Sequence, residues 1–439
     1  MRSPTPARDK IAYRRLTQKD AHLIATRHEM LYAGRIGGAR ASFAFCDLTG
    51  LDLSGRALND ADFSGAVLTE VNFERTKLES AIFFAADLRR ANMRAASMRR
   101  ADLRGASLRG ANLTGADLFE TDLREGVIAE RDRSGGFRML RHEETPTDMP
   151  GAVLANANLE RSRMSGAIAV QADFSDAIMR GVRLTRANLR NANLSGAILE
   201  NADLSGADLT NANLTGAVLT GATILHARKD GADMTGVITE APCGISPADL
   251  PEPIHIILKR HAEWVATQGA SGKPAALAGV DLRTVSGLAR YDLTALLAPN
   301  ATLYSAMLEG VRLQGAQLAG ADLRSANLKG ADLRGINLKD ARLKGADLRD
   351  ANLGPLVISG DRLMPSQLGK ADLRNVDFRG ADLNHAGLVQ ADASYANFTG
   401  ANLRRTDFSN ATLEGAVIPR EQLRETLTEG SSGLRLLGR

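Results

Sequence analysis

Every fifth residue is apolar over most of this 439-residue chain. From Phe43 to Ile128 the pattern holds at 18 successive positions without a miss. It resumes one residue out of phase at Leu154, and a third run extends from Leu288 to Leu423. A period of five matches neither the turn of an α-helix nor the alternation of a β-strand. A chain that turns a corner every five residues would explain this pattern. The apolar residue at the centre of each five-residue repeat, called the centre below, would then point inward.

The residues around each centre are stereotyped, as in ADLRGASLRGANLTGADL at 101–118. Alanine stands two residues before the centre, Asp or Asn one before it, and Gly often two after it. Phe43, Phe63 and Phe83 repeat at intervals of 20, which predicts four faces per coil and stacked phenylalanines. Such a lumen is narrow, which accounts for an aromatic content of only 4%. The 42 glycines suit corners that need an unusual φ.

These repeats resemble the pentapeptide-repeat family, whose consensus is A(D/N)LXX, over about 43–128, 152–239 and 276–418. The resemblance implies a mainly β fold, a right-handed quadrilateral β-helix or solenoid. The best-known members of the family protect or inhibit DNA gyrase by mimicking duplex DNA. Mimicry requires an acidic shaft, whereas this chain has a net charge of +4, so a topoisomerase partner is disfavoured by charge.

A larger duplication predicts two tandem β-helical units, at 16–240 and 254–439. Both begin with a short amphipathic helix, an Arg-His pair and a glycine-rich turn before the first pentapeptides. We expect these helices to cap the exposed core and strand edges, with His28 and His261 packed on the first coil. The remaining segments are a disordered basic tail at 1–15, a protruding loop at 129–151, a proline-rich linker at 241–253 and a C-terminal helix at 420–427.

Composition and motifs argue against several classes of protein. The chain has no apolar stretch long enough for a transmembrane helix and no apolar region near its N-terminus that would form a secretory signal. Cys46 and Cys243 are too far apart in sequence to suggest a metal pair, and two cysteines favour a reducing cytoplasm. HExxH, P-loop, Rossmann and nucleophile-elbow motifs are absent. We therefore expect a bacterial cytoplasmic protein that is not an enzyme and needs no cofactor or metal.

Surface charge gives the candidate contact residues. One short stretch concentrates arginines against only two aspartates, and the four faces of a coil spread them into a basic collar without interleaved aromatics. The collar consists of Arg89, Arg90, Arg94, Arg99, Arg100, Arg104 and Arg109. The loop supplies a second candidate set: Arg131, Arg133, Phe137, Arg138 and His142. The collar is interpreted either as a solvated surface laced with salt bridges or as a contact for anions or nucleic acid.

The leading hypothesis is a non-enzymatic rigid scaffold that mediates protein–protein interaction, because nearly all of the chain is structural repeat. One alternative is a gyrase or topoisomerase modulator that uses the 129–151 loop. The other is binding of anions or nucleic acid through the collar. The sequence does not name the protein partner.

Overall fold

The computed structural model describes residues 13–131, 137–360 and 362–433. The chain divides into two compact units, Met1–Ala241 and Pro242–Arg439. The described helices are α1 (Gln18–Tyr32), α2 (Ile254–Ala266) and the short 3₁₀ helices η1 (Pro247–Asp249), η2 (Leu288–Arg290) and η3 (Gln422–Glu425). The strands form three pairs: β1 (Arg14–Arg15) with β2 (Cys46–Asp47), β3 (Gly126–Arg131) with β4 (Phe137–Thr145), and β5 (Leu356–Ser359) with β6 (Arg362–Met364).

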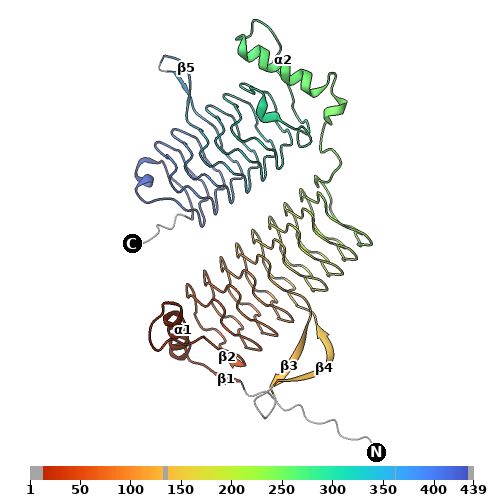
Figure 1. Cartoon of the computed structure of the whole chain (residues 1–439), viewed down its shortest axis with the longest axis vertical. Coiled ribbons are helices and arrows are strands. Elements are labelled where there is room, and N and C mark those ends of the chain that lie inside the picture. Colours follow the sequence, from red (N-terminus) through yellow and green to blue (C-terminus); the bar gives the residue numbers. More distant parts are fainter. Residues whose placement is uncertain (1–12, 132–136, 361, 434–439) are drawn as a thin grey trace, which may run out of the picture. The chain divides into compact units, whose positions relative to one another are not determined.

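Single-residue parallel bridges hold most of each unit together. Asp52 pairs with Asn72, and Ala57 pairs with Lys77, so bridges recur every five residues and join positions 20 apart. The amide of Leu53 donates to the carbonyl of Asn72 at 2.8 Å, and the amide of Asn72 donates to Leu51 at 2.9 Å. Each coil of 20 residues is therefore bridged by hydrogen bonds to the next coil at four places. Successive coils build a β-helix in each unit (Figure 1).

The interior of the β-helix consists of rows of like side chains. The apolar centres and the alanines two residues before them are almost all fully buried. The Phe43 and Phe63 rings stack with centroids 4.9 Å apart, and those of Phe63 and Phe83 stack at 4.8 Å. The predicted stacking at intervals of 20 is thus confirmed. Phe73 packs edge-on against Phe63 at 5.4 Å, so two adjoining faces share one aromatic cluster.

The corners lie two residues after each centre and have positive φ. Gly55 has φ of 67°, as predicted for glycine corners. Many corners nevertheless carry larger residues in the same conformation, such as Asp60 at 59° and Arg100 at 56°. Left-handed backbone costs a non-glycine residue about 1 kcal/mol, which the surrounding ladder bonds offset. Charged side chains can therefore stand in columns along the corners.

The expected loop at 129–151 is a two-stranded antiparallel hairpin, β3–β4, which leaves the first unit at Gly126 (Figure 1). A Cβ on Gly126 would lie 2.9 Å from the carbonyl carbon of Arg104, so only glycine fits at this exit. The ladder then resumes with Asp117 paired to Asn158, a step of 41 residues. Because 41 exceeds a multiple of five by one, the apolar centres shift phase after the hairpin.

A buried hydroxyl closes the base of each hairpin. Thr147 Oγ1 lies 3.0 Å from the Leu103 carbonyl and 2.9 Å from the Arg124 carbonyl. Ser366 Oγ lies 3.0 Å from Leu333 O and 3.3 Å from Gly354 O, where β5–β6 leaves the second unit. Each of these carbonyls also accepts a backbone amide, as Leu103 does from Ala106 and Gly354 does from Gly335, so the hydroxyls add a second buried hydrogen bond at the base of each hairpin.

The two longer helices pack on the first coils of their units through equivalent histidines. His28 of α1 accepts a hydrogen bond from the Ala41 amide on Nδ1 at 3.0 Å. His261 of α2 accepts from the Ala275 amide at 3.1 Å. Both side chains are fully buried, so the expectation that these histidines pack on the first coil is confirmed.

The segments predicted for the two ends of the chain need correction. The disordered tail expected at 1–15 is wrong at its end, because Arg14–Arg15 pair in parallel with Cys46–Asp47; residues 1–12 lie outside the described residues. The expected C-terminal helix at 420–427 is one 3₁₀ turn, Gln422–Glu425. Leu427 then pairs with Asp407, so the ladder continues beyond this turn.

The expected linker at 241–253 belongs to the second unit from Pro242 onward. Ile245 pairs with Val280, and the Cys243 amide donates to Asp281 Oδ2 at 2.9 Å. Its proline-rich sequence departs from the five-residue period, yet Ile245 still provides a bridge to the coils of the second unit.

Phe63→Ala should destabilise the first unit by about 3–5 kcal/mol, because it removes a ring packed between two others and leaves a cavity. Phe84→Ala is the matched control, since this half-buried ring lies outside the lumen, and it should cost less than about 1 kcal/mol. Far-UV circular dichroism during denaturation would measure both variants. Trp264, the only tryptophan, lies in the second unit and should report an unchanged transition. Equal losses in the two variants would contradict a tightly packed lumen.

Burial lowers the pKa of His261 below its usual value. The unfolded chain therefore binds a proton near pH 6 that the folded chain does not. The contribution of neutral His261 to the free energy of unfolding is complete above about pH 6.5 and is lost as pH falls. His261→Gln, which keeps an acceptor for the Ala275 amide, should flatten this dependence by at most about 1.4 kcal/mol per pH unit. Trp264 fluorescence in denaturant at pH 5–7 would measure it. The exposed His255→Gln is the control, and an identical slope in wild type and His261→Gln would refute the assignment.

Candidate functional site

Many arginines on the β-helix surface form an ion pair with the aspartate of their own repeat. In the Asp-Leu-Arg sequence at 102–104, Arg104 holds Asp102 through two hydrogen bonds of 2.8 and 2.7 Å. Asp102 Oδ1 also accepts the Arg104 amide at 3.1 Å, which fixes the turn. The hydrogen bond to Asp102 raises the pKa of the Arg104 guanidinium. The same pairing recurs at Arg89–Asp87, Arg124–Asp122, Arg283–Asp281, Arg324–Asp322, Arg334–Asp332, Arg349–Asp347, Arg374–Asp372 and Arg379–Asp377.

The predicted basic collar is largely such a neutralised surface. Arg89 and Arg104 hold the aspartates of their own repeats. Three further collar arginines reach carboxylates on neighbouring coils: Arg90 with Glu70, Arg99 with Asp117 and Arg109 with Asp148. The Arg94 amide donates to Asn92 Oδ1 at 3.4 Å. The collar therefore matches the salt-bridge interpretation at five of its seven arginines.

Aromatic rings do accompany the collar, contrary to the expectation from sequence. The Arg99 guanidinium lies over the Phe119 ring at 4.4 Å, and that of Arg104 lies 5.6 Å from the Phe84 ring. Phe84 and Phe119 each directly follow an apolar centre, where the side chain faces outward. Their rings cover guanidinium groups that already hold carboxylates, which further occupies the collar.

The predicted contact loop is only partly described. Arg131 ends β3, whereas Phe137, Arg138 and His142 lie in β4. Arg131 pairs with Phe137 in the hairpin register. Arg133 lies outside the described residues. The structure therefore places four of these five residues on adjoining strands of one hairpin.

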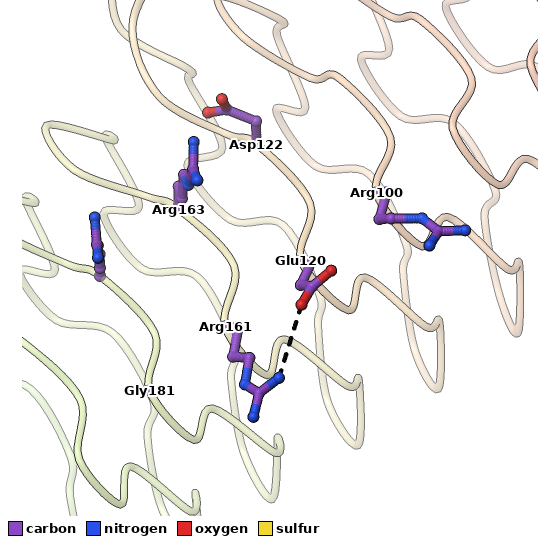
Figure 2. Close-up of a pocket in the computed structure, with 7 residues that line it drawn as sticks. Arg100, Glu120, Asp122, Arg161, Arg163 and Gly181 are labelled. Atoms are coloured by element: carbon purple, nitrogen blue, oxygen red, sulfur yellow. Dashed lines mark ion pairs between the residues drawn. The ribbon is translucent and has the colours of Figure 1, made fainter.

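A charged groove with a cavity volume of about 510 Å³ opens on the first unit, across the coils on both sides of the hairpin insertion (Figure 2). Its lining residues are Arg100, Glu120, Asp122, Arg161, Arg163, Gly181 and Arg183. They stand in two adjoining columns. Arg100, Glu120, Arg161 and Gly181 occupy successive corners, all with positive φ, and Asp122, Arg163 and Arg183 are successive bridging residues of the ladder.

The electrostatics of the groove differ from those of the collar. Arg161 is only loosely paired, 3.8 Å from Glu120 and 3.9 Å from Glu160. Within the described residues, the side chains of Arg100, Arg163 and Arg183 form neither an ion pair nor a hydrogen bond, and all three are exposed. The groove therefore offers uncommitted guanidinium groups, which suit carboxylate or phosphate ligands.

The carboxylates of the groove are weak competitors for these arginines. Burial raises the pKa of Asp122, but hydrogen bonds from Arg124 and the charges of Arg124 and Arg104 outweigh it and lower that pKa. Arg124 Nη2 lies 2.7 Å from Asp122 Oδ2, so this carboxylate is already engaged. Glu120 is exposed at a corner, and its carboxylate lies 3.8 Å from the Arg161 guanidinium. Besides the hydrogen bond to Asp117, the charge of Glu120 helps to raise the pKa of Arg99.

Of the predicted candidates, only Arg100 belongs to this groove, and the sequence interpretation missed Arg161, Arg163 and Arg183. A signal for two of them was present. Arg163 in RSRMS and Arg183 in GVRLT occupy the slot that normally holds Asp or Asn, and they stand 20 residues apart. The 41-residue step across the hairpin hid the alignment with Arg100, because columns before and after it differ in phase.

Metal and membrane sites find no support in the part of the chain that the structure describes. It contains no group of three His, Cys, Asp or Glu side chains placed to hold a metal ion. None of its helices combines the length and apolar character needed to cross a membrane. Cys46 and Cys243 form no disulfide.

Comparison with protein families identifies the class. The family model for pentapeptide repeats matches residues 41–83, 86–124, 147–186, 170–206, 187–224, 197–236, 316–354, 366–392 and 381–418. These segments cover more than half of the chain, so the protein belongs to the pentapeptide repeat family. Members of this family fold as right-handed β-helices.

Solved structures of the same class resemble parts of the chain. HetL, a pentapeptide repeat protein involved in heterocyst differentiation regulation in Nostoc sp. strain PCC 7120, is 29% identical, with a TM-score of 0.29 over 46% of this chain and 79% of its own. A pentapeptide repeat protein from Cyanothece 51142 is 32% identical, with a TM-score of 0.20 over 32% and 87%. QnrB1, a plasmid-mediated fluoroquinolone resistance protein, is 22% identical, with a TM-score of 0.21 over 45% and 83%. No curated protein matches the chain.

Proposed function

We propose that this protein is a non-enzymatic, rigid β-helical scaffold that binds a protein partner in the cytoplasm through a side face of its first unit. The observation that supports this most is the groove itself, which gathers Arg100, Arg163 and Arg183 in one place without an ion pair to any described residue. In the nearby collar, five arginines instead hold carboxylates, as Arg104 holds Asp102. Uncommitted guanidinium groups in one groove are available for a partner.

The proposed scaffold consists of four-sided coils closed at one end of each unit by α1 or α2. Four bridges in every 20 residues support the four-sided geometry. The contacts of His28 and His261 support the capping role, because each ties its helix to the backbone of the first coil. A lumen filled by fully buried side chains deforms little, so the positions of surface groups remain fixed.

Direct binding of nucleic acid through the collar is the weaker proposal. Five collar arginines hold carboxylates, and a phosphate would have to displace those carboxylates first. The salt-dependent affinity of a protein for nucleic acid comes from cationic side chains that phosphates can neutralise. Few collar arginines are available in this way, because most already hold carboxylates.

The scaffold function predicts a partner contact at the groove. A photo-crosslinking residue in place of Glu120, an exposed corner with φ of 56°, should trap a defined protein in cells of the source organism. The same residue in place of Asp340, an exposed acidic corner with φ of 58° in the second unit, is the matched control. Mass spectrometry would identify the adducts. Adducts at neither position, or the same adducts at both, would count against a groove-directed scaffold.

The β3–β4 hairpin supports a second candidate, a topoisomerase modulator, because it interrupts an otherwise continuous ladder. This candidate predicts that the full chain changes gyrase supercoiling activity. A variant in which a short glycine-serine turn replaces the hairpin should lose the effect. Supercoiling unaffected at high protein excess, or affected equally by both proteins, would reject it.

A further inference from the structure

We infer that the groove binds a short acidic segment of the partner protein, with Arg163 and Arg183 as the principal carboxylate-binding residues. The inference rests on the proposed scaffold function and adds the chemistry of the contact. It draws on the spacing of the arginines, on the absence of ion pairs and hydrogen bonds from their side chains to described residues, and on the charges that border them.

The ladder fixes the spacing of the two arginines. Arg163 and Arg183 are bridged partners on adjacent coils, so their Cα atoms lie about 5 Å apart. Arg161 stands two residues from Arg163, at the adjoining corner, and Arg100 lies on the far side of Glu120 (Figure 2). An extended segment lying along the groove would therefore meet several guanidinium groups in succession. Each guanidinium can grip a carboxylate with two hydrogen bonds.

Arginines in the same repeat slot of the second unit show what a structural role looks like. Arg312 Nη1 lies 3.0 Å from Asp292 Oδ2, and Arg342 Nη1 lies 3.7 Å from Asp322 Oδ2. In each case the preceding coil supplies the carboxylate. In the groove, the coil before Arg163 offers Asp122, which Arg124 holds just as Arg324 holds Asp322, but no ion pair joins Asp122 to Arg163. The coil before Arg183 offers Arg163 in place of a carboxylate. Arg163 and Arg183 thus occupy the slot of Arg312 and Arg342, but their side chains form no ion pair within the described residues. Besides the hydrogen bonds from Ser205, the charge of Arg183 still helps to lower the pKa of Asp203 on the next coil.

The lining also leaves room for a ligand. Arg100, Glu120 and Arg161 fill their corners of one column with long side chains, whereas Gly181 leaves the next corner empty. A Cβ at Gly181 would make ordinary contact with Arg161 Cγ at 3.8 Å, so close packing does not require glycine there. The missing side chain keeps the groove open beside Arg183.

The bordering charges favour a protein segment over nucleic acid. The bridging column reads Asp102, Asp122, Arg163, Arg183, Asp203, so aspartates stand on both sides of the arginine pair. A nucleic acid carries a charge at every phosphate and would meet these aspartates as it left the groove. A peptide can place a few carboxylates over the arginines and neutral or basic residues over the aspartates.

The test uses the full chain and a fluorescein-labelled peptide of about ten alternating Glu and Gly residues, about 33 Å long when extended. Fluorescence anisotropy should show saturable binding that weakens with salt. The double variant Arg163→Gln, Arg183→Gln should bind about tenfold more weakly, because two exposed ion pairs are lost. Arg228→Gln with Arg312→Gln is the matched control. It removes the same charge from the same repeat slot outside the groove, and its affinity should stay within about twofold of wild type.

Several outcomes would overturn the inference. Equal losses in the two double variants would mean general charge attraction, and undiminished binding in the groove variant would place the peptide elsewhere. A single-stranded DNA probe that bound more tightly than the peptide, through the same two arginines, would identify nucleic acid as the ligand. If the peptide does not bind while the Glu120 crosslink still traps a protein, this inference fails and the scaffold function stands.

Discussion

The fold depends on parallel hydrogen bonds between residues 20 positions apart. Each bond fixes one coil against the next, and the four bridged positions of a coil bury almost every centre against its counterparts in the neighbouring coils. The pattern repeats with so little variation because a coil contacts only its neighbours, so the same local solution serves throughout. The ladder tolerates insertions at corners only when the flanking residues regain the register, as Asp148 does opposite Ser107.

Outside the lumen, the repeat uses its polar residues to shape the chain. The Asp or Asn before each centre accepts the amide two residues on, as Asp102 does from Arg104 and Asn112 does from Thr114. When an arginine follows the centre, the same carboxylate holds it as well. A high content of charged residues is therefore compatible with a surface that has little net attraction for other molecules.

The groove is a consequence of the same geometry. Replacing the usual Asp or Asn by arginine at two stacked repeats removes two local acceptors and adds two cations in one place. An insertion with a 41-residue step brings Arg100 and Arg161 into one corner column. Substitutions at single repeat slots can thus build a binding surface while the ladder remains intact. The bridges are made by backbone amides and carbonyls, so they form whichever side chain the slot carries.

By itself, the sequence determined the coil, the inward Leu and Ala rows, the stacked phenylalanines and the buried histidines within both helices. These follow from short-range spacing, and a five-residue period admits few conformations. The tertiary structure alone decided which charges meet. Side chains in different coils come together only when the ladder register is known, and the hairpin shifts that register by one residue. The sequence interpretation therefore emphasised the collar from Arg89 to Arg109, whose arginines mostly hold carboxylates, and missed Arg163 and Arg183.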